Sequence, residues 1–248
     1  MRVKILLSAL ALLFASTANA GSVPPGSSSS PSLELVVQIG GSSSGFESFS
    51  VSPGTTSSGL LSFEMMAGDE LFALSFETTA DPDPFISGTF RITNLSSTTQ
   101  DFFLSATLPI TPIPGATVNG GSVGDVVFTD ANGDNTVAIS TLAGVPFFTA
   151  RVDGVAVGVL GAFDNVLMGD GMGQLSGLIG QLSFGDPIPS QVGGPALDTI
   201  SAEVRFNLSA GDSAVIPFFF QVEAVPEPAS ALLLVFGIGA VLARRRSC

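Results

Sequence analysis

The stretch Phe85-Ile-Ser-Gly-Thr-Phe-Arg-Ile-Thr-Asn-Leu95 decides the fold class of this chain. Its odd-numbered positions from Ser87 to Thr93 are polar, whereas most of its even-numbered positions are apolar. A period of two with one apolar face is typical of an antiparallel strand that covers a core on one side. Residues 96–99 (Ser-Ser-Thr-Thr) have turn composition, and a second strand is expected over Asp101–Ile110. The two strands therefore predict a β-hairpin.

Comparable short segments recur along the chain, separated by Gly, Pro, Asn and Asp at intervals of about ten residues. Asp153-Gly154 is a dipeptide favoured in two-residue hairpins. The glycines of Phe163–Gly180 argue against a good helix and predict a loop, with at most a short helical turn. The other expected strands cover residues 33–39, 46–51, 60–66, 70–79, 123–129, 136–142, 147–152, 155–160, 181–184, 196–208 and 214–222. The fold class predicted for residues 33–224 is an all-β antiparallel sandwich, either jelly-roll-like or immunoglobulin-like, with the strand order left open.

The first twenty residues have the composition of a secretory signal peptide. Arg2 and Lys4 precede an apolar stretch, and Ala18-Asn19-Ala20 is a small-residue cleavage site. Cleavage after Ala20 makes Gly21 the expected first residue of the mature chain. Residues 1–20 are thus expected to form a signal helix, and 21–32 a Ser/Gly/Pro-rich linker.

Residues 225–248 combine three features in a fixed order. Val225-Pro-Glu-Pro-Ala-Ser230 overlaps the start of an uncharged apolar run over 229–243, and Arg244, Arg245 and Arg246 follow. As a helix, the run rises about 22 Å, against about 30 Å of bilayer hydrocarbon. It is therefore expected to form a short transmembrane helix, and the arginines of the basic tail 244–248 are expected to hold its end in the cytoplasm. A plain C-terminal membrane anchor is one interpretation of these features.

Together these features resemble the PEP-CTERM sorting domain of Gram-negative bacteria. The resemblance implies that an exosortase-type membrane enzyme recognises Pro226, Glu227 and Pro228 and removes the tail. It also implies export by signal peptidase and the general secretion machinery, transient anchoring in the inner membrane, and a final place at the cell surface or in the extracellular matrix.

Charge and composition restrict what the body can bind. Residues 21–224 contain three arginines and twenty acidic residues, a formal net charge of −17. Such a surface is a poor partner for nucleic acid. The single cysteine is Cys248, so no disulfide is expected in the body. Arg91, Arg151 and Arg205 are candidates for structural ion pairs.

Missing residue types argue against most enzyme chemistry. The chain has no His, Tyr or Trp, and residues 21–224 have no Lys or Cys. Serine and cysteine triads, Ser-Lys dyads, Schiff bases and His/Cys zinc sites are therefore excluded. Only carboxylates remain as acids and bases. We expect no enzyme activity and no cofactor; a glycan hydrolase with two carboxylates is the remaining catalytic alternative.

One loop has oxygen ligands at a suggestive spacing. Asp130, Asn132 and Asp134 follow the 1-3-5 pattern of a calcium loop, but Asn135 and Thr141 stand where Gly and a bidentate Glu are expected. The pattern is also good turn sequence, and the incomplete ligand set favours a polar hairpin turn, with a calcium site as the alternative.

The function expected from these observations is that of an exported, non-enzymatic β-sandwich protein. By its resemblance to PEP-CTERM proteins it would be a structural or adhesive component of the cell surface or of a biofilm or floc polysaccharide. The alternative is a carbohydrate- or calcium-binding module with a specific ligand.

Overall fold

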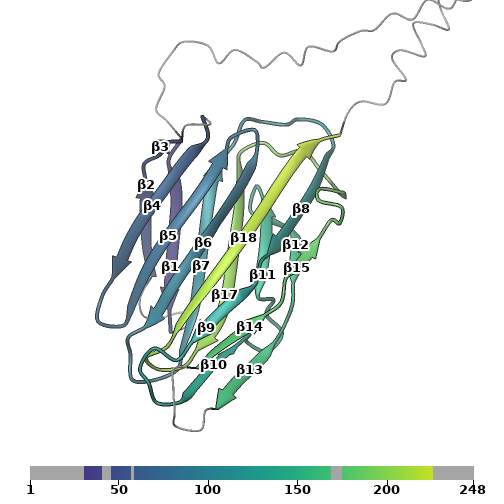
Figure 1. The fold of residues 1–248 in the computed structure, drawn as a ribbon. Helices are drawn as coiled ribbons and strands as arrows, with labels where there is room; N and C mark the ends of the chain where they lie inside the picture. Colours follow the sequence, from purple (N-terminus) through teal and green to yellow (C-terminus); the bar gives the residue numbers. More distant parts are fainter. Residues whose placement is uncertain (1–30, 41–45, 57–58, 169–174, 226–248) are drawn as a thin grey trace, which may run out of the picture.

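The computed structural model describes residues 31–40, 46–56, 59–168 and 175–225. In these ranges the regular elements are β-strands, which form two antiparallel sheets packed face to face (Figure 1). The prediction of an all-β antiparallel sandwich is confirmed at this level. None of the described segments forms a helix with the length and hydropathy of a membrane span. The helices expected over residues 1–20 and 229–243 lie outside the described residues.

The first sheet runs in the order β12-β11-β17-β7-β1-β2, with β10 paired to the end of β17 and β13 paired to β10. Its strands are β1 Leu33–Ile39, β2 Phe46–Val51, β7 Gln100–Pro109, β10 Thr136–Ser140, β11 Phe148–Val152, β12 Val155–Leu160, β13 Asp164–Met168 and β17 Thr199–Leu208.

The second sheet runs in the order β14-β9-β18-β6-β5-β4-β3, with β8 also on β18 and both β15 and β16 on β8. Its strands are β3 Gly54–Thr55, β4 Leu61–Gly68, β5 Phe72–Asp81, β6 Phe85–Asn94, β8 Thr117–Val123, β9 Val126–Thr129, β14 Ser176–Ile179, β15 Leu182–Phe184, β16 Gln191–Gly193 and β18 Ser213–Ala224.

Phenylalanine dominates the core between the sheets. Alternate residues of long strands such as β1, β5 and β18 are buried, as the period of two requires. The ring centroids of Phe90 and Phe218 lie 4.9 Å apart on neighbouring strands of the second sheet, and those of Phe102 and Phe206 lie 5.7 Å apart on the first. Each such side chain contributes about 1.5–3 kcal/mol through burial, which explains how a body without disulfides holds together.

The hairpin predicted over Phe85–Ile110 is wrong. The two strands exist almost as expected, as β6 and β7, but β6 pairs with β5 and β18 whereas β7 pairs with β1 and β17. Residues 95–99 therefore carry the chain from the second sheet to the first. Both strands turn their apolar faces to the same core from opposite sides, so each retains the alternation that suggested a hairpin.

Two further turns cross between the sheets in the same way. Residues 130–135 connect β9 of the second sheet to β10 of the first, and 209–212 connect β17 to β18. The interpretation of 130–135 as a hairpin turn is therefore corrected: it is a polar turn, but the strands on either side do not pair. We call the end formed by 95–99, 130–135 and 209–212 the crossing end; it lies at the bottom of Figure 1.

Other local expectations are met in part. The hairpin at Asp153-Gly154 is confirmed, because Val152 pairs with Val155 and both turn residues have positive φ angles, 50° and 75°. The loop expected over 163–180 is wrong where β13 and β14 form. Strand β8 was not expected, because its glycines and its burial on both faces remove the alternation.

Pro217 explains why β8 and β9 are separate strands. It lies inside β18. The edge of β18 that faces away from β6 pairs with β9 at residues 213–215 and with β8 at 218–224. The carbonyl of Pro217 accepts a hydrogen bond from Gly124 N at 3.0 Å. In an antiparallel strand the N–H and C=O of one residue face the same neighbour, so the donor that proline lacks falls in the gap between β8 and β9.

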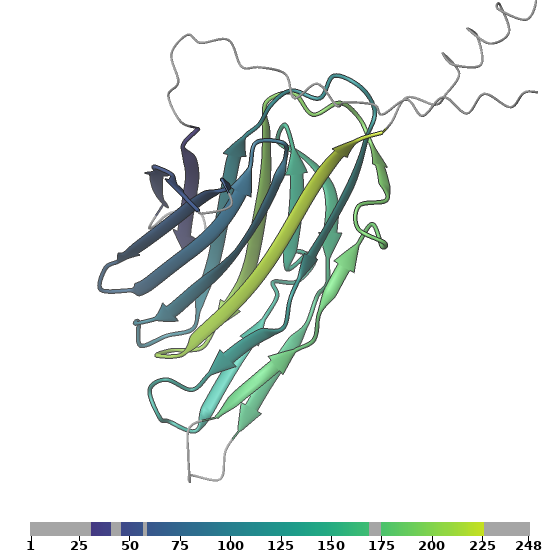
Figure 2. The ribbon, with the colours of Figure 1, turned by 45° about the horizontal axis from the view of Figure 1, so that its top comes forward.

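The described chain starts and finishes at the opposite end of the sandwich, which we call the terminal end. There the loop before β8 approaches both β18 and the segment before β17: Val225 N donates to Ala116 O at 2.9 Å, and Ile113 pairs with Ala196. Figure 2 shows β18 ending at this end, beside the start of β8.

Candidate functional site

The proposed calcium loop lies at the crossing end, and its oxygens are used by the loop itself. Asp130 is fully buried; its Oδ1 accepts from Gly133 N at 2.6 Å and its Oδ2 from Asn135 N at 2.9 Å. Gly133 and Asn135 have φ angles of 76° and 65°, which suit glycine and asparagine. This geometry is a side-chain-supported turn.

Asn132 and Asp134 are held in the same way. Asn132 Oδ1 accepts from Asp134 N at 2.8 Å, and Asp134 Oδ1 accepts from Thr136 N at 2.9 Å. Asn132 Nδ2 donates to Ala210 O at 2.7 Å and so joins two crossing turns. The structure thus brings all three predicted ligands into one loop, and within the described residues no three acidic side chains are arranged around one metal position.

Asp212 is the second buried acid of the crossing end. Its Oδ2 accepts a hydrogen bond from Ser209 Oγ, and its Oδ1 accepts from Ala131 N at 3.3 Å. Burial raises the pKa of Asp212, with a smaller contribution from the nearby charges of Asp134 and Asp130, and the two hydrogen bonds oppose this rise only in part.

Asn94 completes the polar network. It is fully buried at the end of β6, and its Nδ2 donates to three carbonyl oxygens, those of Thr98, Leu208 and Ser209, at 2.9–3.0 Å. Neither Asn94 nor Asp212 was predicted to have this role. The only signal in the sequence is that both stand where a long apolar strand meets a turn.

A groove of about 260 Å³ lies on the outer face of the first sheet. It runs over β7, β17, β11 and β12, and the segment before β11 forms one wall. Its lining includes Phe103, Pro146, Arg151, Val159, Glu203 and Arg205. Charged and apolar side chains therefore meet in one hollow.

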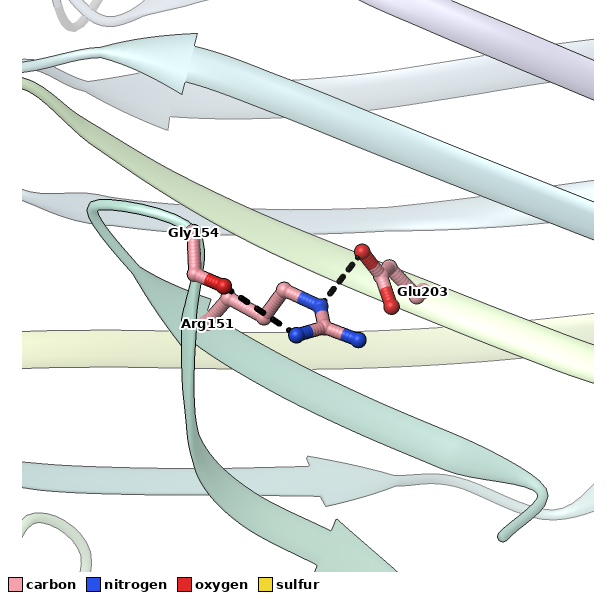
Figure 3. Close-up of polar contacts among 3 residues, drawn as sticks. All are labelled: Arg151, Gly154 and Glu203. Atoms are coloured by element: carbon pink, nitrogen blue, oxygen red, sulfur yellow. Dashed lines mark hydrogen bonds and ion pairs between the residues drawn. The ribbon is translucent and has the colours of Figure 1, made fainter. Parts of the chain in front are cut away.

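Two ion pairs border this groove. Arg151 Nε donates to Glu203 Oε1 at 2.7 Å while Arg151 Nη1 donates to Gly154 O at 3.1 Å (Figure 3). Arg205 Nη2 lies 3.0 Å from Asp101 Oδ2, and this hydrogen bond raises the pKa of Arg205 against the effect of burial. The predicted role in ion pairs is confirmed for Arg151 and Arg205.

Arg91 differs from the other two arginines. It is exposed on β6, on the outer face of the second sheet, and it forms no ion pair with any described residue. The groove on the first sheet therefore contains both of the paired arginines of the body.

Asp153 fixes the loop that leads into β17. Its Oδ2 accepts from Leu197 N at 2.8 Å, and its Oδ1 accepts from Asp198 N and Thr199 N at 2.8 and 2.9 Å. Burial raises its pKa, but the three backbone donors outweigh this and leave the pKa of Asp153 below its ordinary value. The β11–β12 hairpin is thereby tied to the terminal end.

The other predicted functional residues lie outside the described residues. These are the cleavage-site residues Ala18, Ala20 and Gly21, the sorting motif Pro226, Glu227 and Pro228, and the basic stop Arg244, Arg245 and Arg246. They stay predictions from the sequence.

Comparisons with known proteins assign no family to the chain. No family model matches it, and no curated protein matches it. A structure of infectious bursal disease virus, Gx strain, aligns at 15% identity over 83% of this chain and 59% of the viral chain, with a TM-score of 0.21. The chain thus spans less than two thirds of that viral chain, and so low a TM-score supports no argument about function.

Proposed function

We propose that this chain is an exported, non-enzymatic β-sandwich protein that is sorted by a PEP-CTERM-like tail. It ends at the cell surface or in the extracellular polysaccharide matrix, as a structural or adhesive component. The observation that carries the proposal is the position of the motif. Val225, the last described residue, is bonded to the folded body through its N–H to Ala116 O, and Pro226 follows it directly in the sequence.

This position suits recognition by a membrane enzyme. The motif begins at Val225, which is held to the sandwich, so few residues of the sequence separate the folded body from the proposed processing site. The partners in this proposal are an exosortase-type enzyme, signal peptidase, the general secretion machinery and extracellular polysaccharide. The repeated crossings between the sheets favour a jelly-roll-like over an immunoglobulin-like body.

The non-enzymatic part rests on the available side chains. Residues 21–224 have no His, Lys or Cys. Among the described residues the fully buried carboxylates are Asp130 and Asp212, and both are engaged by backbone N–H groups or a hydroxyl of the crossing turns. They are therefore occupied with structural hydrogen bonds and are not presented to a substrate.

Mass spectrometry of the protein isolated from its own cells tests the sorting proposal. We expect a mature chain that starts at Gly21 and lacks the peptide 231–248. Pro226→Ala and Glu227→Ala should cause the unprocessed chain to accumulate in the inner-membrane fraction. Glu223→Ala is the matched control, since Glu223 is an exposed acid just before the motif. An intact tail in the wild type, unchanged by either motif substitution, would identify a plain membrane anchor instead.

A further inference from the structure

We propose that the groove on the outer face of the first sheet binds one sugar ring of a neutral polysaccharide. The two ion pairs hold a pair of adjacent hydroxyl groups, and the apolar wall packs against the C–H face of the ring. This inference names a class of ligand, neutral polysaccharide, for the matrix role proposed above. It rests on that role only for the biological setting in which the ligand is met.

The charge of the groove selects a neutral ligand. The body carries twenty acidic residues and only three arginines, yet Arg151 and Arg205 both lie here, each beside one carboxylate. The groove is therefore close to neutral within an acidic surface. The negative charge of the whole body repels an anionic ligand. A cation is disfavoured because the carboxylates of Glu203 and Asp101 are already paired with arginines. A neutral polar ligand is the class that remains.

The groove also has spare hydrogen-bonding capacity of both kinds. Among the described residues, no hydrogen bond occupies Nη2 of Arg151, Nη1 of Arg205 or Oε2 of Glu203. A hydroxyl group accepts from a guanidinium and donates to a carboxylate, and neighbouring hydroxyls can use both groups at once. Because the ion pairs already fix these side chains, little side-chain entropy is lost on binding.

The apolar lining supplies the second half of a sugar site. Phe103 is the direct cross-strand partner of Arg205, and Pro146 and Val159 also line the groove. One face of a pyranose ring consists mainly of C–H groups, which pack on an aromatic or aliphatic surface. The volume of about 260 Å³ is near the lower end of small-molecule sites, about 300 Å³, so the groove suits a single ring of a longer chain.

Affinity electrophoresis of the full chain in mild detergent tests this proposal. The gels contain one polysaccharide each: dextran, mannan, galactomannan and β-glucan as neutral probes, and alginate as the anionic probe. We expect at least one neutral probe to retard the wild type and alginate to have no effect. Arg151→Gln, Glu203→Gln and Phe103→Leu should each weaken the retardation by about tenfold or more, the effect of losing one hydrogen bond to a charged group or the aromatic face.

Arg91→Gln is the matched control, because it removes an arginine of equal charge from the outer face of the other sheet. It should leave the retardation unchanged, and thermal unfolding should confirm that all variants are folded. Retardation by no neutral probe, by alginate alone, or to an equal degree in the groove variants and wild type would overturn the proposal. Processing at the tail is measured separately by mass spectrometry, so a failed sugar site and a failed sorting signal are told apart.

Discussion

Asp212 combines burial with two nearby carboxylates at the crossing end, and its protonation state therefore depends on the fold. Because its pKa is raised in the native state, the unfolded chain ionises first as the pH rises above 3.8. The stabilising contribution of this group is fully present below pH 3.8 and is lost as the pH rises through the native pKa. Neutral Asp212 can donate to Ser209 Oγ, which in turn can donate to Ala138 O.

Asp212→Asn tests this reasoning. Asparagine imitates the neutral acid, so the variant should be within about 1 kcal/mol of the wild type at pH 4, and its stability relative to the wild type should increase as the pH rises to 8. Urea unfolding of both proteins across this range measures the difference. A difference that stays constant or decreases with pH would contradict a raised pKa.

The hydrogen bonding at the crossing end could be predicted from the sequence only in part. The spacing of Asp130, Asn132 and Asp134 predicted either a turn or a calcium loop, and both readings use the same side-chain oxygens. Only the directions of the backbone N–H groups separate them, and these depend on φ angles such as that of Asn135. The roles of Asn94 and Asp212 were not predicted, because part of their bonding joins segments distant in sequence: Asn94 bonds the carbonyls of Leu208 and Ser209, and Asp212 bonds Ala131 N.

Among the secondary-structure elements, β12 and β15 meet on one side of the sandwich, and the ring of Phe184 lies at their contact. Phe184 of β15, in the second sheet, lies against Gly158 of β12, in the first, and against Gly121 of β8; a Cβ at either glycine would overlap the ring. Phe184 also lies 6.3 Å from Phe220, measured between ring centroids. Small residues on two strands therefore make room for one large residue on a third.

Gly158→Ala should destabilise the protein by about 1–3 kcal/mol, because the added methyl group overpacks this contact. Phe184→Leu removes the ring, so the double variant should be more stable than the two single changes predict by addition. Gly180→Ala is the control: a Cβ there meets no atom within 4 Å. Denaturant unfolding of the wild type, the two single variants and the double variant measures the free energies. If the changes in the free energy of unfolding are strictly additive, the ring does not fill this space.

The strands themselves were predicted better than their pairing. The alternation of apolar and polar residues located β1, β2, β6 and β7 within a residue or so, because a strand that is buried on one face needs an apolar residue at every second position. It could not show that β6 and β7 belong to different sheets, because a strand facing the core from either side has the same pattern. Strands such as β8, which are buried on both faces and rich in glycine, show no such alternation.

At the scale of the whole molecule, the net charge of −17 over residues 21–224 should make stability depend on salt. Screening shortens the range of the self-repulsion from about 30 Å at 0.01 M to about 8 Å at 0.15 M, so the Tm of the full chain should rise by a few degrees with added KCl. The two ion pairs are partly exposed and should offset little of this gain. Differential scanning fluorimetry measures the effect.

The same experiment separates screening from a calcium site. If residues 130–135 form only a turn, CaCl2 and MgCl2 at equal concentration should raise the Tm equally. A larger shift with calcium, abolished by Asp134→Asn, would instead favour the metal alternative at this loop.

The place of β18 decides how the body responds when it is pulled. The strand is hydrogen-bonded along both edges, to β6 on one side and to β8 and β9 on the other, and it ends at Ala224, one residue before Val225. A tether attached there loads the strand along its own length. The bonds on both edges then resist in shear and share the force, instead of breaking one after another, so a pull on residue 225 meets the resistance of both ladders together.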